Sequence, residues 1–256
     1  MKKNVLITGA SGNIGNAIAS LFYDKSYNLF LLGRNVEKLK NIKDNLLDND
    51  KGWIEVIEYD AIKEEENKII NDILQRYKYI DILVNASGMG YYESLKDLDD
   101  NITKKVFEVN FFAPVRLTKA FLSQDREPLW IINILSISSK LPVPFSGIYA
   151  ASKAALYMEM ESARGEFERN IKIINILPGR IESDFSKNAP GTKYFSHGGK
   201  RAKAEDLAKV VYNAFLNGRR EVIWPKKYKY ILWIQRIFPR FYESRLKKLK
   251  EEYEKK

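Results

Sequence analysis

The chain has 256 residues, of which 45% are hydrophobic and 30% are charged, and its formal charge is +10. This length and hydrophobic content fit one large α/β domain with a sizeable core, and they argue against a disordered chain. With no cysteine and a single histidine, His197, the sequence excludes disulfides, thiolate metal sites, a cysteine nucleophile and a histidine metal cluster. We therefore expect no metal site.

Short apolar runs alternate with longer segments of helical periodicity. We expect strands at 4–8, 27–32, 53–59, 80–84, 129–135, 171–177 and 221–224, and helices at 13–24, 36–47, 64–77, 101–123, 149–169 and 204–216. This alternation predicts a Rossmann-type, doubly wound parallel sheet of about seven strands with helices on both faces. Residues 1–224 would form this single domain. The aperiodic stretch 186–201 predicts a loop over the site.

A glycine-rich segment, TGASGNIG at residues 8–15, joins the first expected strand to the first expected helix. Glycines let the backbone turn tightly and approach a pyrophosphate, and a helix N-terminus offers N–H groups and partial positive charge. The segment therefore predicts a dinucleotide-binding loop. The residues expected to hold the coenzyme are Gly9, Ser11, Gly12, Asn13, Ile14 and Gly15.

The second expected strand is followed by Gly33, Arg34 and Asn35. An acidic residue at that position would bind the ribose 2′-hydroxyl of NAD, whereas an arginine can pair with the 2′-phosphate of NADP. Arg34 therefore favours NADP(H), although an arginine at a helix start is also an ordinary surface residue.

Tyr149 and Lys153 lie four residues apart on an expected helix, so their side chains share one face. A free tyrosine has a pKa of about 10, too high for a general base at neutral pH. A nearby ammonium group favours the phenolate. We therefore expect Lys153 to lower the pKa of Tyr149, and Tyr149 to exchange a proton with a substrate oxygen while hydride moves to or from its carbon.

From Thr8 to about Trp224, these motifs and their order resemble the short-chain dehydrogenase/reductase family, in its single-domain branch. The resemblance implies further coenzyme contacts, at Asp60, Ala61, Asn85, Ala86, Gly88, Pro178, Gly179, Ile181 and Ser183. We expect Tyr149 and Lys153 to contact the coenzyme as well, Lys153 through the nicotinamide ribose. The glycine spacing of the loop and the residues Ala86 and Ser87 depart from the usual pattern of this branch.

The same resemblance implies a catalytic tetrad of Asn110, Ser136, Tyr149 and Lys153. Ser136 precedes Tyr149 by the usual thirteen residues and would orient the substrate oxygen, with Ser138 as the alternative. By resemblance, Asn110 would hold a water that links Lys153 to solvent. A buried asparagine can also satisfy a local break in the backbone.

Three segments, 89–95, 140–148 and 186–201, would line the substrate site, and their aromatic and aliphatic content predicts a small apolar carbonyl or alcohol. We expect an NADP-dependent oxidoreductase acting on CH–OH or C=O groups, assembled as a homodimer or homotetramer. The alternative is an NADP-binding interaction or regulatory protein without turnover. No feature predicts nucleic-acid binding.

Residues 225–256 form a basic amphipathic C-terminal extension with eleven Lys or Arg and four Glu. This extension could pack on the body, build an oligomer contact, or make weak peripheral contact with a membrane. No apolar stretch reaches the roughly 20 residues needed to cross a bilayer. We therefore expect a cytoplasmic protein, membrane-peripheral only through this extension.

Overall fold

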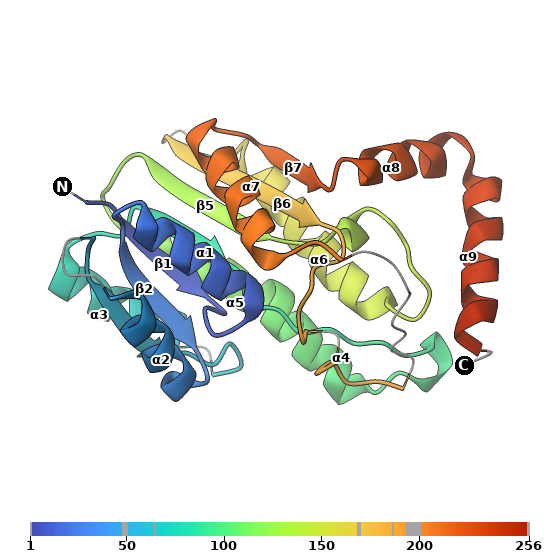
Figure 1. Ribbon diagram of the computed structural model, residues 1–256, viewed down its shortest axis with the longest axis horizontal. Coiled ribbons are helices and arrows are strands. Elements are labelled where there is room, and N and C mark those ends of the chain that lie inside the picture. The colour runs from blue at the N-terminus through green and yellow to red at the C-terminus, as the bar shows by residue number, and fades with distance from the viewer. Residues whose placement is uncertain are drawn as a thin grey trace.

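A computed structural model describes residues 2–47, 51–63, 65–167, 170–185, 187–192 and 201–254. Seven parallel strands form one sheet in the order β3-β2-β1-β4-β5-β6-β7. The strands are β1 (Asn4–Thr8), β2 (Asn28–Gly33), β3 (Ile54–Glu58), β4 (Ile82–Asn85), β5 (Leu129–Ile134), β6 (Ile171–Pro178) and β7 (Glu221–Trp224). The predicted doubly wound parallel sheet is confirmed (Figure 1).

Helices cover both faces of this sheet. They are α1 (Asn13–Asp24), α2 (Val36–Leu46), α3 (Glu66–Tyr77), α4 (Asp100–Phe107), α5 (Ala113–Phe121), α6 (Gly147–Ala163), α7 (Ala204–Leu216), α8 (Lys227–Ile237) and α9 (Pro239–Glu254), with short 3-10 turns at Leu95–Asp97 and Ile137–Ser139. One buried cluster joins the sheet to α1, α2 and α7, and the other joins it to α3, α5 and α6.

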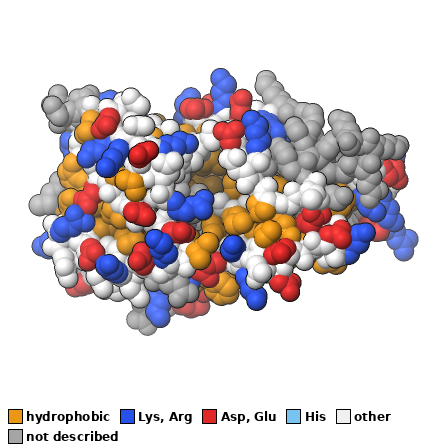
Figure 2. Space-filling model, turned by 90° about the horizontal axis from the view of Figure 1, so that it is seen from below, with side chains coloured by type: hydrophobic (Ala, Val, Ile, Leu, Met, Phe, Trp, Pro, Cys, Tyr) orange, Lys and Arg blue, Asp and Glu red, His pale blue; other side chains and the backbone are white. Residues whose placement is uncertain are grey.

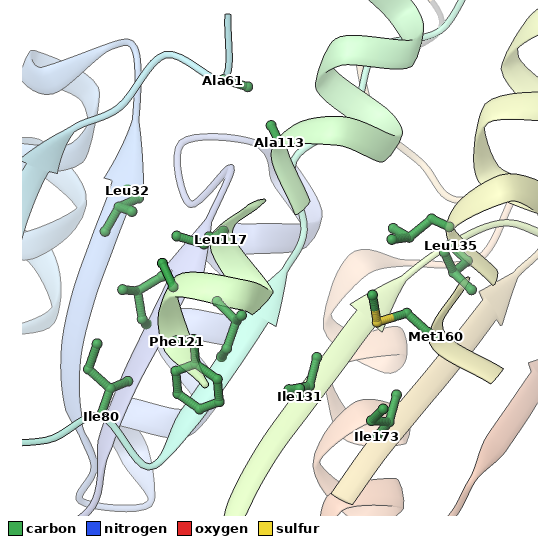
Figure 3. Packing of buried hydrophobic residues seen from close by; sticks show 14 of the residues in the cluster. Leu32, Ala61, Ile80, Ala113, Leu117, Phe121, Ile131, Leu135, Met160 and Ile173 are labelled. Atoms are coloured by element: carbon green, nitrogen blue, oxygen red, sulfur yellow. The ribbon is translucent and has the colours of Figure 1, made fainter. Parts of the chain in front are cut away.

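The side chains of each strand alternate between these two clusters, as the two-residue period of a strand requires. In β1, Leu6 belongs to the cluster under α3, α5 and α6, whereas Val5 and Ile7 belong to the opposite one. Figure 3 shows Leu117 of α5 and Met160 of α6 turned toward the sheet in the first cluster. Because both faces are covered, the central strands are mostly apolar, and the buried amides of Asn85, Asn133 and Asn175 hydrogen-bond to one another across β4, β5 and β6.

The predicted helix at 101–123 is interrupted. Between α4 and α5 lies one stretch of π-helix, Glu108–Phe112. Pro114 has no N–H and cannot donate to the carbonyl of residue 110, which an unbroken α-helix would require. The expected helix at 149–169 ends earlier, at Ala163. His197 and most of the expected loop at 186–201 lie outside the described residues.

The C-terminal extension forms α8 and α9 at one end of the molecule, beyond α6 and β7 (Figure 1). Tyr228, Ile231, Leu232 and Tyr242 pack against the cluster that contains α6. None of the described helices is both long enough and apolar enough to cross a membrane.

Candidate active site

The site lies where the order of the strands along the chain reverses, between the adjacent strands β1 and β4. The chain runs outward from β1 to β3 on one side and from β4 to β7 on the other, so the loops after β1 and β4 leave a crevice at their carboxyl ends. Thr8 ties the two loops together, because its Oγ1 accepts hydrogen bonds from the backbone N–H groups of Ala86 (3.1 Å) and Ser87 (3.2 Å).

The loop after β1 is shaped by glycines that admit no side chain. Gly9 has φ +65°, and a Cβ there would lie 2.9 Å from the carbonyl oxygen of Ala86. A Cβ on Gly15 would lie 2.3 Å from the carbonyl oxygen of Gly9. These approaches hold the loop against both the segment after β4 and the first turn of α1.

The N-terminus of α1 fits an anionic group. Gly12 is the N-cap residue, no side chain caps the helix, and its first turn contains no acidic residue. The N–H groups and the positive end of the helix dipole are therefore not compensated by a side chain of this helix. Gly12 and Asn13 are exposed, and Ser11 and Ile14 are half-buried.

The end of β2 lies beside this loop. A Cβ on Gly33 would lie 3.2 Å from the Ser11 hydroxyl, and the next residue, Arg34, is exposed. Asn35 caps α2 by accepting from the N–H of Lys38 (2.9 Å). Arg34, the residue expected to favour NADP(H), therefore lies at the edge of the expected dinucleotide-binding loop.

The remaining expected coenzyme residues line the ends of β3, β4 and β6. Asp60, Ala86, Gly179, Ile181 and Ser183 are half-buried, Gly88 is exposed, and Ala61, Asn85 and Pro178 are buried. Asn85 does not offer its side chain amide to the crevice, since it donates to Asn133 Oδ1 (2.9 Å) and Thr118 Oγ1 (3.4 Å).

Tyr149 and Lys153 share one face of α6, as their spacing predicts. The Lys153 side chain is only 3% exposed, and its Nζ donates to the carbonyl oxygens of Ile134 (3.1 Å) and Ser87 (3.5 Å). Of the serines after β5, Ser136 is the one whose hydroxyl hydrogen-bonds to Tyr149. The Ser136 oxygen also accepts from the N–H of Ser138 (3.1 Å), so Ser138 positions Ser136.

Asn110 is fully buried inside the π-helical turn. Its Oδ1 accepts from the N–H of Met89 (2.8 Å), and its Nδ2 donates to the Met89 carbonyl (2.8 Å) and to Ser152 Oγ (2.9 Å). A Cβ on Gly88 would lie 3.4 Å from both Asn110 Oδ1 and Lys153 Nζ. The side chain therefore anchors the segment after β4 next to Lys153, and the expected water link stays a prediction.

Burial shifts the pKa values of both Tyr149 and Lys153. It raises the pKa of Tyr149 above the usual value, with Tyr92 adding to the rise and the Ser136 hydrogen bond opposing it. Burial also lowers the pKa of Lys153 to about 8. The sequence predicts a lowered pKa for Tyr149, whereas the residues around it in the folded chain raise that pKa. The reason is that desolvation disfavours both the Tyr149 phenolate and the Lys153 ammonium group.

Aromatic side chains surround the phenol of Tyr149. The ring of Phe185 lies 5.7 Å away and that of Tyr92 6.5 Å away, centroid to centroid. Figure 2 shows a hollow near the middle of one face of the molecule, with hydrophobic side chains inside it. The expected wall residues Tyr194 and Phe195 lie outside the described residues.

The segment after β6 is fastened to the segment after β4. The N–H of Tyr92 donates to the carbonyl of Pro190 (3.1 Å), and Glu93 Oε2 accepts from the N–H (2.9 Å) and the hydroxyl (2.8 Å) of Thr192. Gly191 has φ +104°, and a Cβ there would lie 2.1 Å from the Tyr92 carbonyl oxygen. These contacts close one side of the site.

Sequence reasoning missed two contributors to the site. Phe185 lies two residues after Ser183, the last expected coenzyme contact, and was not included in the substrate wall. Tyr228 of α8 lies so close to Gly179 that a Cβ on Gly179 would come 2.0 Å from the tyrosine ring. The signal for Tyr228 was weak, because nothing in the sequence indicates which body residue α8 meets.

Known proteins resemble this chain in sequence and in fold. A profile described as short chain dehydrogenase matches residues 3–193. The chain belongs to the short chain dehydrogenase family. A mouse relative, dehydrogenase/reductase SDR family member 7B, is 33% identical over 221 residues, which cover 82% of this chain and 68% of the relative.

Solved structures of this family have the same fold. An alcohol dehydrogenase from Thermococcus sibiricus, complexed with 5-hydroxy-NADP, is 25% identical with a TM-score of 0.79, covering 87% of this chain and 96% of that one. A short chain dehydrogenase/reductase from Burkholderia phymatum, in complex with NAD, is 19% identical with a TM-score of 0.83, covering 92% and 93%. The latter supports the fold alone.

Proposed function

We propose that this short chain dehydrogenase is an NADP(H)-dependent oxidoreductase that interconverts a carbonyl and an alcohol, with Tyr149 as general acid and base. One observation carries the proposal. Ser136, just after β5, hydrogen-bonds to Tyr149, and Lys153, on the same face of α6, donates to the Ile134 carbonyl at the end of β5, beside the segment that Asn110 anchors.

The coenzyme, when bound, supplies or accepts the hydride. The Ser136 hydroxyl holds the substrate oxygen, and the Tyr149 hydroxyl donates its proton to that oxygen in the direction of reduction. The raised pKa of Tyr149 keeps the phenol protonated at neutral pH, which suits a proton donor. Lys153, whose pKa burial lowers to about 8, shares a face of α6 with Tyr149 and would supply positive charge on that face at neutral pH.

NADP(H) is favoured by Arg34. The side chain is exposed at the end of β2, next to the loop that would receive the pyrophosphate. A guanidinium group there can form paired hydrogen bonds with a 2′-phosphate. The T. sibiricus alcohol dehydrogenase, which is similar to this chain, is complexed with an NADP derivative.

An apolar substrate is favoured by the surroundings of the phenol. The aromatic rings of Tyr92 and Phe185 flank Tyr149, and neither side chain carries a charge that a substrate would meet. A small ketone, aldehyde or secondary alcohol with a hydrophobic group fits such a wall.

The test is NADPH oxidation with a panel of apolar carbonyls, measured for the unaltered chain, Tyr149→Phe and Tyr157→Phe. Tyr157 lies two turns further along α6 and serves as the matched control. We expect Tyr149→Phe to lower kcat by about 10²- to 10⁴-fold while NADPH affinity changes little, and Tyr157→Phe to keep its turnover. Unchanged turnover in Tyr149→Phe would contradict the assigned role. NADPH binding without turnover on any carbonyl would favour the regulatory alternative.

We also propose a homodimer or homotetramer. Phe112 and Met158 are large hydrophobic side chains that stay exposed on the π-helical turn and on α6. The molar mass from light scattering tests this assembly, and a strictly monomeric mass would refute it.

A further inference from the structure

The C-terminal extension leaves an apolar face uncovered. Tyr230, Trp233, Ile237, Phe238 and Phe241 are exposed, and we call this set the outer aromatic face. Tyr230, Trp233 and Ile237 are spaced three and four residues apart, so they lie along one side of α8. The rings of Trp233 and Phe238 are 6.2 Å apart, which joins the end of α8 to the following turn.

This face is not needed to hold α8 on the body. Tyr228, Ile231 and Leu232 lie on the opposite side of the helix and pack against the core cluster. The helix is therefore apolar on two sides, and only one of them is buried by the described body. A contiguous exposed apolar patch of this kind marks an interaction site.

The residues around the outer aromatic face are basic. Residues 226–248 contain eight Lys or Arg and a single Glu, and α8 itself contains no acidic residue. Lys229 and Arg236 are exposed along one border of the face. On α9, Arg245 and Lys248 are exposed on the same side as Phe241. An apolar stripe is thus bordered by cations.

Two occupants can be compared by charge. In a two-fold contact between copies of this chain, the same patch would meet itself, so the cations of one copy would face those of the other. An anionic bilayer presents the complementary charge, and its boundary accepts Trp and Tyr rings together with aliphatic side chains. The charge pattern therefore favours the lipid surface.

We propose that the outer aromatic face binds the surface of an anionic lipid bilayer, with α8 lying in the interfacial layer. The extension is fastened to two segments of the site: Tyr228 lies against Gly179, and the Tyr242 hydroxyl donates to the carbonyl of Pro142 (2.9 Å). Binding through α8 therefore places the substrate region next to the bilayer.

Vesicle flotation of the full chain tests the proposal. The probes are vesicles of phosphatidylcholine alone and vesicles with 30 mol% phosphatidylserine, each at low and at high salt. We expect binding to the anionic vesicles that weakens as salt rises. Lys229→Gln and Arg236→Gln should each lower the partition coefficient by about 5-fold. Trp233→Ala combined with Ile237→Ala should lower it by about 10-fold or more.

Leu216→Ala is the matched control. Leu216 ends α7 and is 60% exposed, against 59% for Trp233, but it lies outside the extension. This variant should bind vesicles as the unaltered chain does. Far-ultraviolet circular dichroism of every variant checks that the fold is kept.

Tryptophan fluorescence gives a second readout. Of the four tryptophans, only Trp233 is exposed, so anionic vesicles should shift the emission to the blue, and Trp233→Phe should remove most of the shift. The proposal is overturned if the chain does not bind anionic vesicles, or if Trp233→Ala with Ile237→Ala binds unchanged. It is also overturned if those substitutions dissociate an oligomer while vesicle binding is absent.

Discussion

Replacing Asn110 by alanine should destabilise the protein and release the segment that begins at Met89. The substitution removes three hydrogen bonds from a side chain with no exposed surface, two of them to the backbone of Met89 and one to Ser152. At about 1 kcal/mol for each bond, the free energy of unfolding should fall by about 2 to 4 kcal/mol. The lower end applies if water reaches Met89, which is half-buried.

Urea unfolding measures this loss directly. For a chain of this size, a slope near 3 kcal/mol per M turns the loss into a midpoint about 1 M lower. Ser152→Ala, which removes one of the three bonds, should fall between Asn110→Ala and the unaltered chain. The exposed Asn213 on α7 is the control, and Asn213→Ala should stay within about 0.5 kcal/mol.

The result separates two roles for Asn110. If its side chain anchors Met89, Asn110→Ala loses stability and activity together. A variant that loses turnover while its unfolding free energy stays within about 0.5 kcal/mol would refute the anchoring argument. The proton-relay role implied by the family resemblance would then account for the loss.

Three further substitutions test other parts of the site. Lys153 has a pKa of about 8 in the folded chain, below its value in the unfolded chain, so the unfolded chain binds more protons between about pH 8 and pH 10. The free energy of unfolding should therefore rise across this range by roughly 2 to 3 kcal/mol. Urea titrations at pH 7 and pH 9.5 measure this rise, and Lys153→Met should lose it. Gly15→Ala would set a methyl group 2.3 Å from the Gly9 carbonyl oxygen, so calorimetric titration should show NADPH binding lost, and normal affinity would mean that the loop yields. Arg34→Asp should raise KM for NADPH far more than for NADH, and equal effects on both would contradict the preference for NADP(H).

Local pattern determined most of the fold. The predicted bounds of β1, α1, α7 and β7 coincide with those of the structure. Buried parallel strands are continuous apolar runs, and the helices that cover them show a 3.6-residue period, so each element can be recognised without its neighbours. The glycine loop was also predictable, because its function depends on consecutive residues.

Parts of the candidate site were predictable for the same reason. Tyr149 and Lys153 share a helix face, and Ser136 lies a fixed number of residues before Tyr149. The break at Asn110 could have been predicted from Pro114, whose missing N–H removes one helical hydrogen bond. The partner that stabilises the break, Met89, could not, because it comes from a different segment.

Contacts between distant segments were decided by the tertiary structure alone. Glu93 and Thr192 are 99 residues apart in the sequence, and Tyr228 contacts Gly179 from the C-terminal extension. The direction of the Tyr149 pKa shift belongs to the same class, since it follows from the desolvation of the phenol by its neighbours rather than from its spacing to Lys153. Sequence determines which residues can lie on one face of an element, whereas packing determines what that face meets and how much water it keeps.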